Sequence, residues 1–104
     1  MIDFDLLPVP NQRFSSLLDE AWHEIEIRTL GSGACVVSIW RDNVPVVACV
    51  RALPNRPLIP YRYLEHGNFL FLTQNGEYPA FQNFGTSCRL IYASPEELEE
   101  VRNG

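Results

Sequence analysis

Residues 34–52 read ACVVSIWRDNVPVVACVRA, in which two strongly apolar segments flank Asp42 and Asn43. Val, Ile and Trp suit a pleated, half-buried surface, and Asp and Asn tolerate the positive φ of a tight turn, so this stretch predicts one β-hairpin. A two-residue loop would pair Arg41 with Val44, Ile39 with Val46, Val37 with Ala48 and Cys35 with Val50. Both faces of the hairpin are then largely apolar, and we expect both faces to need cover.

Two more strands are predicted before this hairpin. Residues 14–18 place Phe, Ser and Leu on one face, Asp19-Glu20 marks a turn, and residues 21–30 alternate apolar with charged side chains. Together with the hairpin, these segments predict a meander of about four strands. Residues 1–9 read as a mixed lead-in that could pack on a neighbouring surface.

The second half of the chain carries the strongest breakers of regular structure. Pro54, Pro57 and Pro60 exclude a regular helix and a central strand from residues 53–67, so we expect an extended connection that lies on or across the sheet. Short strands are then predicted at 69–73 and 87–93, separated by the Asn75-Gly76 turn and a shaped loop at 78–85.

The chain ends in a helix signal. Ser94, Pro95 and Glu97 match a capping box with proline at the first helical position, so residues 94–104 predict a short, acidic, exposed helix. The whole pattern predicts a single all-β domain, a small antiparallel β-sandwich or partly open β-barrel of about six or seven strands, with a short C-terminal helix. Its expected parts are a lead-in at 1–9, a β core at 10–93 and a helical tail at 94–104.

The composition limits what the chain binds. A net charge of −5 and a pI near 4.9, without a cluster of Lys or Arg, argue against direct nucleic-acid binding. The sequence contains no run of about 18 apolar residues, so it predicts no membrane span. Two aspartates stand near the N-terminus, where a signal peptide carries positive charge. We therefore expect a cytoplasm-like compartment. Cys35, Cys49 and Cys88 lie in apolar segments without a C-x-x-C pair, which predicts three buried, reduced thiols.

No pattern in the sequence predicts catalytic chemistry. His23 shares the parity of Ile25 and Ile27, which favours a packed histidine, and His66 is expected in a loop. No Cys/His cluster has the spacing of a zinc site, and the Gly-Ser-Gly at 31–33 is too short to cradle a phosphate. We therefore expect no enzymatic activity, no catalytic residue, no bound metal and no cofactor.

Five segments, in this order, resemble one known family, the small baseplate plug proteins of contractile-tailed bacteriophages. They are Pro10 to Phe14, Asn55 to Leu64, Asn68 to Phe71, Phe84-Gly85 and Leu90 to Tyr92. The resemblance covers about residues 9–93 and implies an all-β protein without enzymatic activity. It also implies a place in the virion, at the tail tip among hub, tube and needle (spike) proteins, after assembly in the host cytoplasm. The implied role is to plug the centre of the tip and join hub to needle, as a homo-oligomer for which threefold symmetry is the expectation.

This reading predicts that aromatic residues and Arg of the second half form a protein interface, because assembly surfaces are enriched in both. The residues expected there are Tyr61, Arg62, Tyr63, Phe81 and Phe84. Two rival hypotheses belong to other classes of protein. One is a small β-barrel binding module for a ligand or nucleic acid, and the other is a small enzyme with a cysteine nucleophile.

Overall fold

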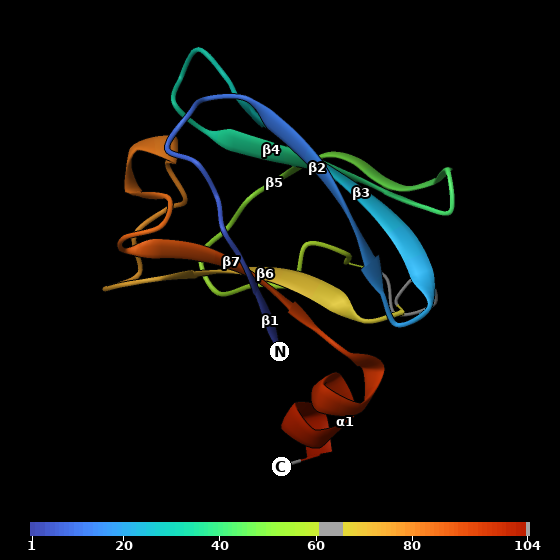
Figure 1. The fold of residues 1–104 in the computed structure, drawn as a ribbon. Helices are drawn as coiled ribbons and strands as arrows, with labels where there is room; N and C mark the ends of the chain where they lie inside the picture. Colours follow the sequence, from blue (N-terminus) through green and yellow to red (C-terminus); the bar gives the residue numbers. More distant parts are fainter. Residues whose placement is uncertain (61–65, 104) are drawn as a thin grey trace.

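The computed structural model, which describes residues 1–60 and 66–103, folds into two antiparallel sheets that face each other, with one helix below them (Figure 1). The first sheet has the order β2-β3-β4-β5 and the second has the order β1-β7-β6. The elements are β1 (Ile2–Phe4), β2 (Gln12–Leu18), β3 (Ala21–Thr29), β4 (Cys35–Arg41), β5 (Val44–Arg51), β6 (Asn68–Thr73), the 3-10 turn η2 (Phe81–Asn83), β7 (Cys88–Ala93) and α1 (Pro95–Asn103). The predicted all-β class with a C-terminal helix is confirmed, and the two layers form a sandwich in place of a closed barrel.

Two-residue turns build the four-stranded sheet. Asp19 and Glu20 join β2 to β3, and Asp42 and Asn43 join β4 to β5, with φ between 49° and 68° at all four residues. Positive φ at both central residues gives the turn a twist that matches the flanking strands. The predicted hairpins and the four-strand meander are therefore confirmed.

The predicted register of the central hairpin is wrong beyond its first pairs. Ile39 pairs with Val47 and Val37 pairs with Val50, because two register shifts interrupt the β4–β5 ladder. The shifts place Val47 opposite Ile39 and Val50 opposite Val37, whereas an unbroken ladder would place Val46 and the smaller Ala48 at these positions. Cys49 lies between Val47 and Val50, at the shift opposite Val37 and Ile39, and adopts φ 51° there. It is exposed, so the prediction of three buried thiols is wrong for this residue.

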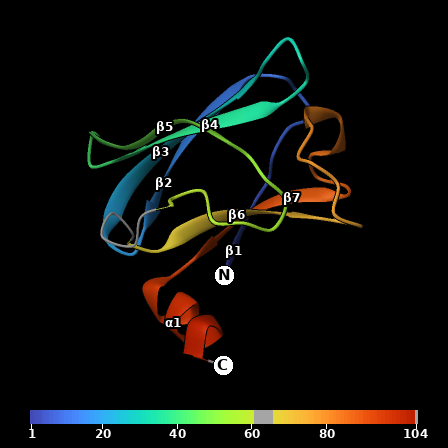
Figure 2. The same cartoon turned by 180° about the vertical axis from the view of Figure 1, so that it is seen from behind.

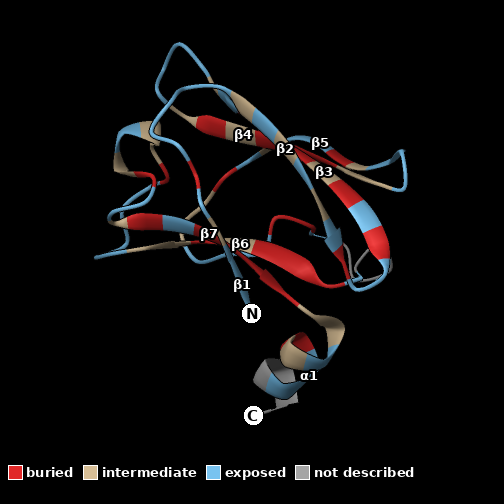
Figure 3. Ribbon diagram, viewed as in Figure 1, coloured by how far each residue is buried: buried red, intermediate tan, exposed pale blue. Residues whose placement is uncertain are grey.

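The core lies between the two sheets (Figure 3). The largest side chains of its interior are fully buried; from the first sheet they are Ile25, Ile27, Val37 and Ile39, and from the second Phe69, Phe71, Leu90 and Tyr92. His23 is also fully buried, as the parity of β3 predicts. The outer face of β4 is only partly covered, since Val36 and Trp40 keep intermediate exposure while Ser38 is buried.

The segment that was expected to be a lead-in contributes a strand to the second sheet. Residues Ile2–Phe4 form β1, which pairs antiparallel with β7. Phe4 turns its ring toward the core, with ring centroids 5.2 Å from Phe14 and 6.0 Å from Phe69. This aromatic contact explains why so short a strand is part of the domain.

The proline-rich connection runs beside β6 (Figure 2), the strand that it was expected to lie on or across. The backbone N–H of Leu58 donates to the Phe69 carbonyl at 2.8 Å, and that of Asn55 donates to the Phe71 carbonyl at 2.8 Å. The buried Asn68 side chain accepts from the Ile59 N–H and donates to the Ile59 carbonyl, both at 3.0 Å. The connection therefore covers the outer edge of β6 without forming a regular ladder.

The C-terminal helix begins with the predicted capping box. The Ser94 hydroxyl accepts from the Glu97 N–H at 3.2 Å, and the Glu97 carboxylate accepts from the Ser94 N–H at 3.0 Å. Leu98 is buried and docks the helix on the domain. Among the helices of the described residues, none has the length and apolar character needed to cross a membrane.

Candidate protein interface

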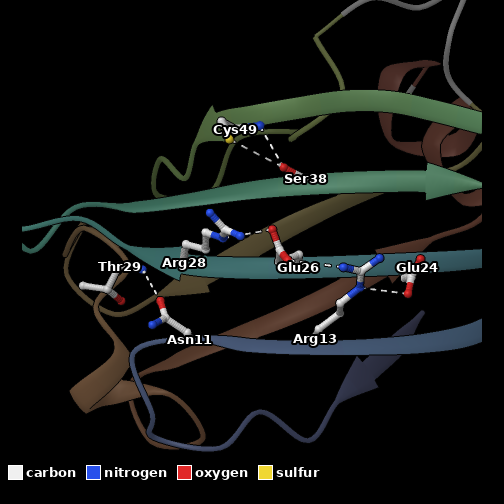
Figure 4. Close-up of polar contacts among 8 residues, drawn as sticks. All are labelled: Asn11, Arg13, Glu24, Glu26, Arg28, Thr29, Ser38 and Cys49. Atoms are coloured by element: carbon white, nitrogen blue, oxygen red, sulfur yellow. Dashed lines mark hydrogen bonds and ion pairs between the residues drawn. The ribbon is translucent and has the colours of Figure 1, made fainter.

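The outer face of the four-stranded sheet carries a row of polar and charged side chains that crosses the strands (Figure 4). β2 and β3 alternate along their lengths, so one set of residues points to the core and the other points away from it. The outward set on these two strands comprises Arg13, Ser15, Leu17, Trp22, Glu24, Glu26 and Arg28. Sheet geometry therefore displays these side chains on one surface.

Arg13 is the centre of the charged part of this face. Its Nε lies 2.8 Å from the Glu24 carboxylate, its Nη1 lies 3.5 Å from Glu26, and its guanidinium carbon lies 4.9 Å from the centre of the Trp40 ring. Arg28 Nε extends the chain of charges, at 3.1 Å from Glu26. The hydrogen bond to Glu24 raises the pKa of Arg13 and lowers the pKa of Glu24. Two positive and two negative charges thus compensate one another on this part of the face.

An apolar corner lies next to these charges, at the turn end of the β2–β3 hairpin. Leu17 and Trp22 face each other across the two strands and are 63% and 50% exposed. Large apolar side chains that stay exposed side by side are a feature of surfaces that meet a partner. The corner was not predicted as an interface, although both residues fall out of phase with their buried neighbours in the sequence.

A groove opens at the other end of the same hairpin. Its volume is about 700 Å³, and it is lined by residues 11–13 and 26–31. Hydrogen bonds from Thr29 fix the segment before β2 beside β3: the Thr29 N–H donates to Asn11 Oδ1 at 3.2 Å, and the Thr29 hydroxyl donates to the Pro10 carbonyl at 2.7 Å. The groove is open to solvent, and its polar and charged residues expose more apolar than polar surface to it, which fits a contact with a protein surface better than an enclosed ligand.

The structure places only part of the predicted interface. Tyr61, Arg62 and Tyr63 lie outside the described residues. Phe81, in η2, is partly buried against the core, and Phe84 is 3% exposed with its ring stacked on a core phenylalanine, so Phe84 supports this loop from inside.

Tyr78 is the exposed aromatic residue of the loop that leads into η2. Its side chain is 59% exposed, and the guanidinium carbon of Arg51 lies 5.5 Å from the centre of its ring. A tyrosine beside an arginine is the composition that the sequence predicted for a contact surface. Tyr78 is not among the five predicted contact residues, because the sequence does not show which loop aromatics turn outward.

The buried histidine and the two buried cysteines of the interior are kept in their uncharged forms. The His23 ring stands 3.0 Å from the Ala21 carbonyl through Nδ1, and its Nε2 accepts from Arg41 Nε at 3.4 Å. Burial lowers the pKa of His23, which keeps the ring neutral. Burial raises the pKa of Cys35 and takes that of Cys88 to about 11, so neither thiol forms a nucleophilic thiolate near neutral pH. Within the described residues, no three His, Cys, Asp or Glu side chains gather as a metal site would require.

Comparison with protein families identifies the chain. The sequence model of the family described as cyanophage baseplate Pam3 plug gp18 matches residues 1–96. The chain belongs to this baseplate plug family. The match includes every strand of this plug protein and ends at the second residue of α1. Among curated proteins, none matches the chain.

Membership of the family confirms the resemblance seen in the sequence and extends it to the N-terminal strand. A baseplate plug is a structural component of the virion tail and contacts other components of the baseplate. The structure adds a surface that suits such contacts, since the outer sheet face combines compensated charges with an exposed apolar corner.

Proposed function

We propose that this plug protein fills the centre of a contractile tail tip and joins the hub to the needle. The observation that supports this role is the outer face of the β2–β5 sheet, where Leu17 and Trp22 are exposed beside the charges around Arg13. Two hairpins closed by two-residue turns, β2–β3 and β4–β5, build the sheet that carries this face, as a part that transmits force between neighbours would require.

The role is mechanical, and on contraction of the tail the plug would dissociate or rearrange its contacts. The threefold homo-oligomer expected from the resemblance belongs to the same proposal, because subunits around a tail axis are related by rotation. Tyr61, Arg62, Tyr63, Phe81 and Phe84 stay predicted contact residues. For Phe84 the contact is indirect, through the loop that it supports.

The test measures the mass of complexes in solution. The plug protein is purified alone and then mixed with the hub and with the needle protein of the same phage, and each mixture is analysed by size exclusion with light scattering. A complex of fixed stoichiometry with both proteins supports the proposal. A plug protein that ignores both and instead binds an oligonucleotide or a small ligand overturns it in favour of a binding module.

A double variant tests the predicted connection residues. Tyr61→Ala with Tyr63→Ala is expected to weaken hub binding while thermal unfolding stays cooperative. Loss of folding in this variant would place the two tyrosines in the core.

A further inference from the structure

The described part of the sandwich has four strand edges, and three of them are blocked or short. β6 is covered by the proline-rich connection through backbone hydrogen bonds to Phe69 and Phe71. β5 carries Pro45 and two register shifts, and β1 has only three residues. Proline, bulges and short length are the means by which proteins prevent edge-to-edge pairing.

Among the residues that the structure describes, the fourth edge, β2, has none of these protections. Its seven residues pair with β3 without a register shift and contain no proline, and their one charged side chain, Arg13, is paired with Glu24 on the outer face. A long, regular edge strand with free backbone groups is a template for another strand. β2 is therefore the strand edge on which an added strand fits best.

The geometry of the hairpin shows which groups of β2 point away from the sheet. The Asp42 N–H donates to the Trp22 carbonyl at 2.7 Å, and the Trp22 N–H donates to Asp42 Oδ1 at 2.9 Å. The N–H and C=O of Trp22 therefore point toward β4 and away from β2. Trp22 and Leu17, which lie opposite each other, thus form a non-hydrogen-bonded pair. By alternation, the N–H and C=O groups of Leu17, Ser15 and Arg13 point off the free edge.

The side chains beside this edge define what an added strand should carry. Leu17 is 63% exposed next to Trp22, and an apolar side chain placed opposite Leu17 would cover both. Ser15 pairs with Glu24, whose Oε1 accepts from Arg13 Nε at 2.8 Å. Because serine is short, a Lys or Arg opposite Ser15 can extend across it toward the second oxygen of that carboxylate. Leu17 and Ser15 are two residues apart, so the matching strand has an apolar residue and a basic residue at the same spacing.

A second copy of this chain fits the edge less well. Each copy carries a net charge of −5, and its own β2 offers serine where a basic residue is favoured. Two copies joined through β2 would also be related by a twofold axis, which a tail axis with different ends does not provide.

We propose that the free edge of β2 is the site at which an extended segment of a neighbouring baseplate component adds a fifth strand to the β2–β5 sheet. That segment carries an apolar residue opposite Leu17 and a basic residue opposite Ser15. The inference rests on the proposed function, because it names how the hub or needle is held.

The experiment compares two substitutions at one position. Ser15→Pro removes the outward N–H and is tolerated in the ladder to β3, since this N–H points away from β3. Ser15→Ala removes the hydroxyl and keeps the N–H, so it is the matched control. Binding of the purified hub and needle proteins is measured by calorimetry, and thermal unfolding of each variant is followed by circular dichroism.

The expected result is at least a tenfold loss of affinity in Ser15→Pro, with near-normal affinity in Ser15→Ala and cooperative unfolding in both. Leu17→Lys, which leaves the backbone unchanged, is expected to weaken the same complex. Hydrogen exchange adds a direct readout. The amides of Arg13, Ser15 and Leu17 exchange rapidly in the free protein and become protected in the complex, whereas those of Phe14 and Ser16 are protected in both states.

The outcomes separate the two proposals. If the unmodified protein binds hub or needle and Ser15→Pro binds equally well, the edge inference is overturned and the proposed function stands. If the unmodified protein binds neither component, both fall. If the free protein is a dimer that Ser15→Pro dissociates, or if the Ser15 amide is already protected in the monomer, the partner-strand inference is overturned.

Discussion

Gly67 lies where the second sheet leaves no space for a side chain. Its φ is +84°, and a Cβ atom built on it would lie 2.1 Å from the Tyr92 hydroxyl oxygen. That hydroxyl donates to the Asp19 carboxylate at 2.6 Å and lies 2.9 Å from the His66 carbonyl. Gly67→Ala therefore strains the backbone and displaces the ring that links β7 to the β2–β3 turn.

The magnitude of the effect follows from these two contributions. A residue with Cβ in the left-handed region costs about 1–2 kcal/mol. Loss of the Tyr92 hydrogen bond to a charged group costs about 1.5–3 kcal/mol. We expect the free energy of unfolding to fall by about 2.5–5 kcal/mol in Gly67→Ala, which lowers the melting temperature by roughly 10–40 °C for a domain of this size.

Chemical denaturation monitored by circular dichroism measures this loss, and two glycines serve as controls. Gly33 has φ +93° with no atom within 4 Å of its ideal Cβ, so Gly33→Ala isolates the backbone strain. Gly31 has the same open surroundings without a positive φ, so Gly31→Ala is expected to change stability by less than about 0.5 kcal/mol. A Gly67→Ala protein no less stable than Gly33→Ala would refute the argument from the Tyr92 contact.

Three further predictions concern buried or reactive groups. Asn68→Ala removes both side-chain hydrogen bonds to Ile59, so stability should fall by about 2–4 kcal/mol and the Ile59 amide should lose protection from hydrogen exchange. Burial lowers the pKa of His23 below 6.5, so the unfolded state takes up a proton first as pH falls. The free energy of unfolding should therefore be at its full value above about pH 7.5 and decline below about pH 6.5. In urea denaturation, His23→Gln should make the unfolding midpoint fall less over the same pH range. Of the three free thiols, only Cys49 is exposed, so it should react with a thiol reagent in the native protein. The buried thiols of Cys35 and Cys88 should react only on unfolding. Equal reaction rates for all three thiols in the native protein would contradict the structure.

Local signals in the sequence predicted much of this fold. The tight turn at Asp42-Asn43 and the capping box at Ser94 depend on a few adjacent residues, and each was predicted with its chemistry. The burial of His23 followed from period-2 alternation in one strand. Signals of this kind survive in the sequence because the interactions that make them span only a few residues.

The contact residues predicted for the interface stay a prediction, and the structure exposes a further surface that the sequence did not indicate. The sequence favoured aromatic residues of the second half, whereas the structure exposes Leu17 and Trp22 in the first hairpin and holds Phe84 inside. Whether an aromatic side chain packs or protrudes depends on what the opposite sheet offers it. No local pattern contains that information.

The sequence by itself determined every described strand except β1, the tight turns, the capped helix and, through ordered motifs spread along the chain, the family. Only the tertiary structure decided the register of β5, the pairing of β1 with β7 and the exposure of one free edge at β2. The physical reason is that bulges, edge pairing and cover arise from contacts between segments far apart in the chain. Their free energy depends on how the two sheets fit together, and this fit is a property of the packed domain.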